Sequence, residues 1–175
     1  LSQLAGMLSL AAPPKRMESY DISNTGASDI VASMVVYAGA RPLKRDYRRF
    51  KMKTVAGTDD YASLAETLSR RAAEYEMARR GEKPDGPQNQ FATLPDLLLI
   101  DGGRGQVGAV KQALRGTALE HVPTFGMVKD DHHRTRALLY QNEELPIAEN
   151  SEAFKLLTHI QDEVHRFAIS YHRSL

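Results

Sequence analysis

The chain has no cysteine and no long apolar segment, and both absences narrow what it can be. None of its 175 residues is Cys, which excludes disulfide bonds, thiolate zinc sites and iron–sulfur clusters, and fits a reducing, cytoplasmic compartment. No apolar run approaches the ~20 residues that a membrane-spanning helix requires, so we expect no membrane partner. Any bound metal must be held by carboxylates, histidines, carbonyls and water, which favours hard ions such as Mg²⁺ or Mn²⁺.

The composition that is present is typical of one folded domain. Hydrophobic residues make up 42% of the sequence and charged residues 26%, proportions that suit a globular domain with its own core. Residues 1–15 are mildly apolar, begin with Leu and lack the basic start of a signal peptide. We therefore expect residues 1–15 to be a linker or N-terminal extension, and residues 16–175 to form the domain.

Basic residues are concentrated in one segment, although the net charge is only +1. Between residues 41 and 53 the chain has a single acid, Asp46, and seven basic residues: Arg41, Lys44, Arg45, Arg48, Arg49, Lys51 and Lys53. Such a segment is typical of a surface that contacts nucleic-acid phosphates. It is equally typical of a solvated strand whose charges prevent edge-to-edge aggregation. Spacing alone leaves both interpretations open.

Hydrophobic periodicity and turn residues predict a mixed α/β order. Strands are expected at 17–23, 28–37, 43–52, 96–100, 123–128 and 137–140, and helices at 59–80, 104–115 and 152–172, with polar loops at 81–93 and 129–136. The first three strands form an antiparallel meander, and helical crossovers lead to later strands. The fold class is therefore α/β, a mixed sheet of three antiparallel strands plus parallel strands flanked by helices. This order is typical of the ribonuclease-H-like fold.

Two aspartates and one helix are candidates for a metal centre. Asp21 lies in the first predicted strand, and Asp101 ends an apolar strand at the edge where open α/β sheets place ligands. If these strands are neighbours, the final helix can bring Asp162, Glu163 or His165 to both carboxylates. Such a set can hold divalent cations for phosphodiester hydrolysis. Simpler roles remain open, since Asp21 can bond a turn and Asp101 can begin a loop.

Other polar residues are expected to be structural. Five of them fit helix ends or the surface: Asp59, Asp60, His121, His159 and His172. The segment 102–105, Gly-Gly-Arg-Gly, resembles a phosphate-binding loop but lacks the Walker spacing and its lysine. We therefore expect no nucleotide cofactor, and a turn that lets backbone approach the site closely.

Several long motifs occur along the chain in a fixed order. They are YDIS (20–23), VASMVVY (31–37), YRRFKMKTV (47–55), DDYASL (59–64), LPDLLLIDGGRGQ (94–106), VKDDHHRT (128–135) and EVHRFAISYHR (163–173). Together they resemble the C-terminal endonuclease domain of UvrC, the incision subunit of bacterial nucleotide excision repair. The resemblance covers about residues 16 to 173, nearly the whole chain.

The resemblance implies a ribonuclease-H-like DNA endonuclease that incises 5′ to a lesion and has an Asp-Asp-His metal centre. Carried over by motif, the aspartates are Asp21 in YDIS and Asp101 in LLLIDGG, and the histidine is His165 in EVHRFA. The preference for His165 over Asp162 rests on the resemblance. Asp60, in DDY, matches a further acidic position associated with activity. The implied cofactor is Mn²⁺ or Mg²⁺, and a neutral imidazole favours Mn²⁺.

The implied partners are damaged double-stranded DNA and UvrB, the latter through parts of the full-length protein that are absent here. For DNA contact we expect two groups of residues: Lys129, Asp130, His132, His133 and Arg134 in the 129–136 loop, and Arg48, Arg49 and Lys51 in the basic segment. The loop is otherwise an ordinary surface loop. Two further functions remain open, a nuclease for RNA–DNA hybrids and a binding module whose metal centre is vestigial.

Overall fold

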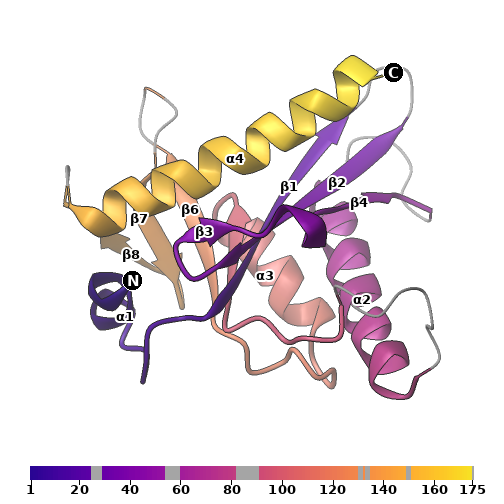
Figure 1. Ribbon diagram of the computed structural model, residues 1–175, viewed down its shortest axis with the longest axis horizontal. Coiled ribbons are helices and arrows are strands. Elements are labelled where there is room, and N and C mark those ends of the chain that lie inside the picture. Colours follow the sequence, from indigo (N-terminus) through magenta and orange to yellow (C-terminus); the bar gives the residue numbers. More distant parts are fainter. Residues whose placement is uncertain are drawn as a thin grey trace.

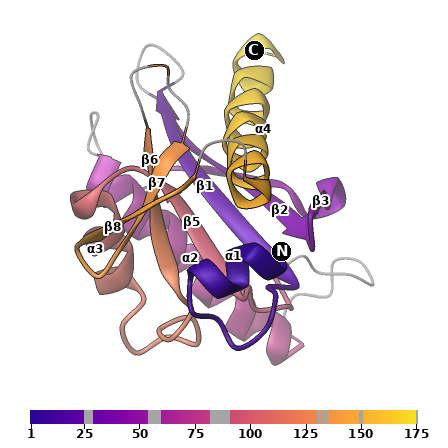
Figure 2. The ribbon, with the colours of Figure 1, turned by 90° about the vertical axis from the view of Figure 1, so that its left-hand side faces the viewer.

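A sheet with helices on both faces forms the domain. The computed structural model describes residues 1–24, 29–53, 60–81, 91–129, 132, 135–148 and 151–174, with backbone alone at 171–174. α4 (Glu152–Ser174) crosses one face of the sheet, whereas α2 (Asp60–Arg79) and α3 (Arg104–Ala113) lie on the other (Figures 1 and 2). The predicted mixed sheet flanked by helices is confirmed. No helix within these ranges is long and apolar enough to cross a membrane.

β1 (Arg16–Asn24) lies in the middle of the sheet. On one side it pairs antiparallel with β2 (Ile30–Ala38), whose other edge carries the short strands β3 (Arg41–Pro42) and β4 (Arg48–Lys51). On the other side it is parallel to β5 (Leu97–Asp101), which is parallel to β6 (Thr124–Lys129). β7 (Thr135–Tyr140) and β8 (Glu143–Pro146) extend the sheet as antiparallel strands. The pairing of β1 with β5 is the one that the predicted metal centre requires.

Alternation along the strands divides the apolar side chains between two cores. Odd-numbered positions of β1 and β5, including Met17, Leu97 and Leu99, pack on the side of α4. Even-numbered positions, including Tyr20 and Leu98, pack on the side of α2 and α3. Because successive strand side chains point to opposite faces, this parity also assigns a face to the polar residues at the strand ends.

The N-terminal segment contributes to the core on the α4 side. No helix is predicted there from the sequence, yet α1 (Ser2–Met7) forms, and Leu4 and Leu8 are buried with residues of α4. The Gln3 side-chain carbonyl accepts a hydrogen bond from the Ala153 backbone N–H at 2.8 Å. This bond satisfies one of the N–H groups that have no partner within the first turn of α4.

Two elements differ from the sequence prediction. Only the second half of the predicted strand 43–52 is a strand, β4; its first half contains a 3-10 turn (η1, Lys44–Asp46), and β3 lies just before it. The 3-10 turn brings the Asp46 carboxylate 2.7 Å from Nη1 of Arg16. β8 was not predicted, and it pairs with β7 across a two-residue turn. Both turn residues, Gln141 and Asn142, have positive φ (50° and 67°), as a type I′ hairpin requires. Neither is the glycine that usually marks such a turn.

A buried ion cluster attaches α2 to the sheet. The Glu18 carboxylate accepts hydrogen bonds from Arg71 Nε and Nη2 at 3.0 and 2.9 Å, from Arg16 Nε at 3.0 Å and from the Tyr20 hydroxyl at 2.6 Å. Burial raises the pKa of Glu18, but Arg71 and Arg16 outweigh burial and hold the pKa below its ordinary value. The negative charge is thus fully paired, and loss of one arginine would leave it buried without its main partner.

Candidate metal centre

Three strand ends direct polar side chains to the α4 side of the sheet. Asp21 on β1, Asp101 on β5 and Lys129 on β6 occupy odd positions, the set that packs toward α4. The parallel register pairs Tyr20 with Ile100, so the next residues, Asp21 and Asp101, lie side by side at the carboxyl ends of the two strands. Strand parity and register therefore bring the two carboxylates together, as the sequence predicts.

α4 brings a histidine to the two carboxylates. Leu157, Ile160 and Val164 are buried beneath the helix, and His165 follows Val164 at the edge of this buried face. Its Nε2 lies 3.2 Å from Asp101 Oδ2 and 3.9 Å from Asp21 Oδ2. One ligand atom from each of the three side chains lies within 4.8 Å of the other two. In the described part of the chain, no other group of His, Asp or Glu is this close.

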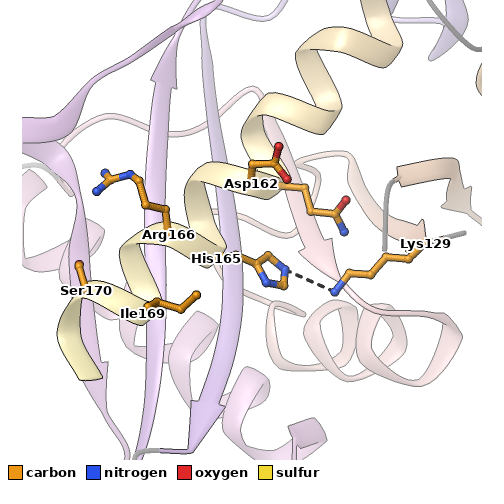
Figure 3. Close-up of a pocket in the computed structure, with 7 residues that line it drawn as sticks. Lys129, Asp162, His165, Arg166, Ile169 and Ser170 are labelled. Carbon is orange, nitrogen blue, oxygen red and sulfur yellow. Dashed lines mark hydrogen bonds between the residues drawn. The ribbon is translucent and has the colours of Figure 1, made fainter. Parts of the chain in front are cut away.

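Lys129 adds a positive charge beside this trio. Its Nζ lies 3.0 and 3.1 Å from the two carboxylate oxygens of Asp101, and 3.4 Å from His165 Nε2 (Figure 3). The β6–β7 pairing shifts register between Val128 and Lys129, at the point where the strand ends beside the carboxylates. The ammonium therefore neutralises part of the negative charge of the pair.

The two carboxylates bind protons with different affinities. Burial and the nearby charge of Asp101 raise the pKa of Asp21 from 3.8 to about 7, against the opposing effect of His165. Burial also disfavours the ionised form of Asp101, but hydrogen bonds from His165 and Lys129 outweigh burial and lower its pKa. The hydrogen bond with Asp101 raises the pKa of His165. Two adjacent carboxylates that retain a shared proton near neutral pH carry more negative charge than the groups around them balance, so the site favours binding of a cation.

The donor set of the trio fits a divalent cation. Two carboxylates and one imidazole nitrogen are ligands that Mn²⁺ and Mg²⁺ accept, and thiolates that would favour softer ions do not occur in the chain. The side chains of Asp21 and Asp101 are 14% and 10% exposed, and that of His165 is 39% exposed. The cluster is thus held from below by the sheet and open on the solvent side, where water and a substrate oxygen can complete the coordination.

A close backbone approach supports the loop that follows Asp101. A Cβ atom on Gly126 of β6 would lie 2.5 Å from the carbonyl oxygen of Gly102, closer than real Cβ atoms approach. Glycine is therefore required for β6 to lie this near the loop. No role was predicted for Gly126, although a glycine inside an apolar strand is a known sign of close backbone approach.

A groove of about 800 Å³ runs along α4 beside the trio. Its lining, drawn in Figure 3, consists of Lys129, Gln161, Asp162, His165, Arg166, Ile169 and Ser170. Asp162, one of the sequence alternatives to His165, lines this groove and is not part of the trio. Glu163 instead accepts hydrogen bonds from the Tyr47 hydroxyl and from Arg166 Nε, both at 2.6 Å. Among the three candidates on α4, His165 alone joins the carboxylates.

Comparison with known proteins identifies the family. Residues 5–169 match the model of the UvrC RNAse H endonuclease domain. The chain belongs to this family. It is 50% identical over 178 residues to UvrABC system protein C of Alkaliphilus oremlandii, and 48% identical over 175 residues to that of Lachnospira eligens. Each alignment covers 100% of the chain and 28% of the relative, so the chain spans just over a quarter of the length of these relatives.

A solved structure shares the fold of this UvrC-family domain. Human ENDOV superposes with a TM-score of 0.54 at 10% sequence identity, covering 96% of this chain and 89% of that one. At this identity the likeness concerns the fold alone. With the family match it confirms the predicted ribonuclease-H-like fold.

The predicted DNA-contact residues of the UvrC-family domain lie on different sides of the sheet. Arg48 lies over the Phe91 ring on the α2 side, 5.5 Å from its centroid. Arg49 points to α4, where its Nη2 donates to the Phe167 carbonyl and the Ser170 hydroxyl, both at 2.9 Å. Arg49 thus positions α4 in this structure, whereas Lys51 is exposed.

Neither His132, from the predicted loop residues 130–134, nor Asp60 is part of the trio or of the groove lining in the described part of the chain. His132 is exposed, and Asp130, His133 and Arg134 lie outside the described residues. Asp60 begins α2, is exposed and is not part of the metal-binding trio. Contact with DNA by these residues, and the activity-related role of Asp60, stay predictions.

Proposed function

We propose that this UvrC-family domain is a divalent-metal-dependent DNA endonuclease that hydrolyses the phosphodiester bond 5′ to a lesion. The observation that carries the proposal is the convergence of Asp21, Asp101 and His165 at the carboxyl ends of two parallel strands. Membership of the UvrC RNAse H endonuclease domain family supports nuclease chemistry and a place in nucleotide excision repair.

Asp21, Asp101 and His165 would hold Mn²⁺ or Mg²⁺ in this enzyme. The bound ion would activate a water molecule and stabilise negative charge on the leaving oxygen. The raised pKa of Asp21 supports the assignment, because it reports excess negative charge that a dication would balance. The imidazole ligand makes Mn²⁺ the better of the two ions.

Lys129 and the α4 groove would bind the strand that is cut. Lys129 Nζ already lies beside Asp101 and His165, where it can donate to a phosphate oxygen as negative charge develops. Arg166 lines the same groove with a side chain that is 56% exposed. Gln161, one helical turn before His165, also lines the groove, but its side-chain nitrogen is buried and has no hydrogen-bond partner among the described residues. The cationic donors that line the groove are therefore Lys129 and Arg166.

We infer the partners of the domain from its membership of the family. We take the substrate to be damaged double-stranded DNA in the cytoplasm, and UvrB to be the protein that positions it. These assignments concern the longer UvrABC system protein C relatives, of which the chain covers 28%.

The experiment combines metal binding with DNA cleavage. Mn²⁺ is titrated into the chain by calorimetry, and nicking of lesion-containing duplex is measured with UvrB present, using a full-length protein that carries this domain and the same substitutions. The variants are Asp21→Asn, Asp101→Asn and a control, Glu152→Gln, whose carboxylate is 80% exposed at the start of α4. We expect both aspartate variants to lose Mn²⁺ binding and nicking, and the control to keep both.

Two outcomes would contradict the proposal. Full nicking by Asp101→Asn would show that the trio is not the catalytic centre. Faster cleavage of an RNA–DNA hybrid than of lesion-containing duplex would identify a different substrate for the same centre.

A further inference from the structure

A second hollow lies on the α3 side of the sheet, away from the α4 groove. It encloses about 370 Å³ between α3 and the β7–β8 turn. Three basic side chains line it, Arg104, Lys111 and Arg115, together with the amide side chains of Gln112, Gln141 and Asn142. No acidic residue from the described part of the chain takes part in this lining. Its charged and amide groups are the donors that an anionic ligand requires.

The three cations have no acidic partner among the described residues. Arg104 Nη2 donates to the Asn142 backbone carbonyl at 3.0 Å, and Lys111 Nζ lies 5.6 Å from the Tyr140 ring centroid. Glu144, on the nearby strand β8, is paired with Arg136 at 2.9 Å. All three cations are exposed. Positive charge is therefore concentrated here without an ion pair, although exposed cations on a helix commonly pair with acids one turn away.

A glycine in the middle of α3 also points to a ligand. Gly108 lines the hollow, and a Cβ atom built on it would meet nothing within 4 Å. Packing therefore does not require glycine at this position, whereas at Gly105 a Cβ atom would lie 2.0 Å from the Tyr61 hydroxyl. A glycine inside a helix costs about 1 kcal/mol relative to alanine. Open backbone on the hollow's surface is what the close approach of a ligand requires.

The first cation of the hollow follows closely in sequence on a residue of the metal centre. Arg104 follows Asp101 by three residues and begins α3, so the row of cations starts at the sheet edge that carries the trio. Lys111 follows at helical spacing, about 10 Å further along the axis of α3, and Arg115 lies in the turn just after the helix ends at Ala113. A row of cations that starts three residues after Asp101 and continues past the end of α3 matches an extended polyanion better than a compact anion or a folded acidic peptide.

We propose that the α3 hollow, defined by Arg104, Gly108, Lys111 and Arg115, binds the phosphate backbone of the DNA substrate at a distance from the cut bond. The inference rests on the proposed function, because it takes the polyanion at the metal centre to be DNA. DNA would then contact the domain on both sides of the trio, in the α4 groove and in the α3 hollow.

The experiment measures how DNA affinity depends on salt. Binding of a fluorescent duplex to the chain is followed by anisotropy between about 50 and 300 mM KCl, a range over which the Debye length falls about 2.5-fold, with Ca²⁺ replacing Mn²⁺. The test variant is Lys111→Gln with Arg115→Gln. The control is Arg79→Gln with Lys155→Gln, which removes the same charge from two side chains that are each 62% exposed. Arg104 is left intact because it adjoins the metal-site loop.

If both side chains contact phosphates, the test variant should lose about 0.9 per contact from the slope of log affinity against log salt, and bind about eightfold more weakly per contact near 0.1 M salt. The control should match the wild type. Equal slopes for test variant and wild type would overturn the proposal and leave the hollow to another anion, such as an acidic peptide. Absence of DNA binding by the wild type at the lowest salt would also overturn it.

Nicking by the same proteins separates this inference from the proposed function. If nicking depends on Asp101 but the salt slope of the test variant is unchanged, only the proposal for the α3 hollow is refuted. If the salt slope of the test variant changes but Asp101→Asn still cuts DNA, the proposal for the α3 hollow stands and the proposed metal centre is refuted.

Discussion

Replacement of Asp21 by Asn should stabilise the metal-free domain above neutral pH. In the folded chain the pKa of Asp21 is raised from 3.8 to about 7, first by burial and then by the charge of Asp101. The folded state therefore binds more protons than the unfolded state between these two values, and its stability falls as pH rises through this window. The full cost above pH 7 is about 4 kcal/mol, since each tenfold change in proton affinity corresponds to 1.36 kcal/mol. Asp101 and His165 titrate together with Asp21, so the cost belongs to all three groups and not to Asp21 alone. We therefore expect Asp21→Asn to recover about half of the 4 kcal/mol, on the order of 2 kcal/mol.

The measurement is thermal unfolding in EDTA, followed by circular dichroism at pH 5 and pH 8. For a domain of this size 2 kcal/mol corresponds to an increase in Tm of roughly 4–8 °C. The increase should be largest at pH 8 and less than half as large at pH 5, because at pH 5 the folded state still holds a proton that most unfolded chains have already lost. Asp101→Asn is the matched control, because its carboxylate accepts favourable bonds from Lys129 and His165. That variant should not gain stability at either pH.

Addition of Mn²⁺ should reverse the order of the two proteins. A ligand at a hundred times its Kd stabilises the folded state by about 2.7 kcal/mol, and this gain belongs to the wild type if Asp21 is a ligand. If Asp21→Asn is no more stable than the wild type at pH 8 in EDTA, the reasoning is refuted. Equal stabilisation of both proteins by Mn²⁺ would show that Asp21 does not bind the ion.

Three further predictions concern the residues that support the centre. Arg71→Met should lower the free energy of unfolding in urea by about 3–5 kcal/mol, because Glu18 stays buried without its main partner; a loss below 1 kcal/mol would contradict the fully paired cluster. Gly126→Ala should cost about 1–3 kcal/mol and weaken Mn²⁺ binding in calorimetry, since the new Cβ displaces the Gly102 carbonyl. Lys129→Met should preserve Mn²⁺ binding but slow nicking about 100-fold or more; an unchanged rate would remove Lys129 from catalysis.

Strand patterns predicted more of this molecule than helix and loop patterns did. The alternation in β1 and the apolar run of β5 determine which face each side chain occupies, and from this the meeting of Asp21 and Asp101 follows once the strands are parallel neighbours. The ion cluster of Glu18 and Arg71 joins residues 53 apart in sequence, and no local pattern predicts such a contact. α1 has six residues, too few for helical propensity to be decisive, and is stabilised by packing against the core.

The choice of His165 over its neighbours illustrates where a local pattern could have contributed more. Successive residues of a helix are rotated by about 100°, so the buried residues Leu157, Ile160 and Val164 define one direction that faces the sheet. Measured from the middle of that face, His165 lies about 110° away and Asp162 about 170° away on the same side, while Glu163 lies about 90° away on the other side. Only a side chain near the edge of the buried face can reach ligands on the sheet surface. Periodicity therefore favours His165 over Asp162, but it cannot tell which edge of α4 overlies the strand ends. That depends on the direction in which α4 crosses the sheet, and hence on packing against β1, β2 and β7 rather than on residues within the helix.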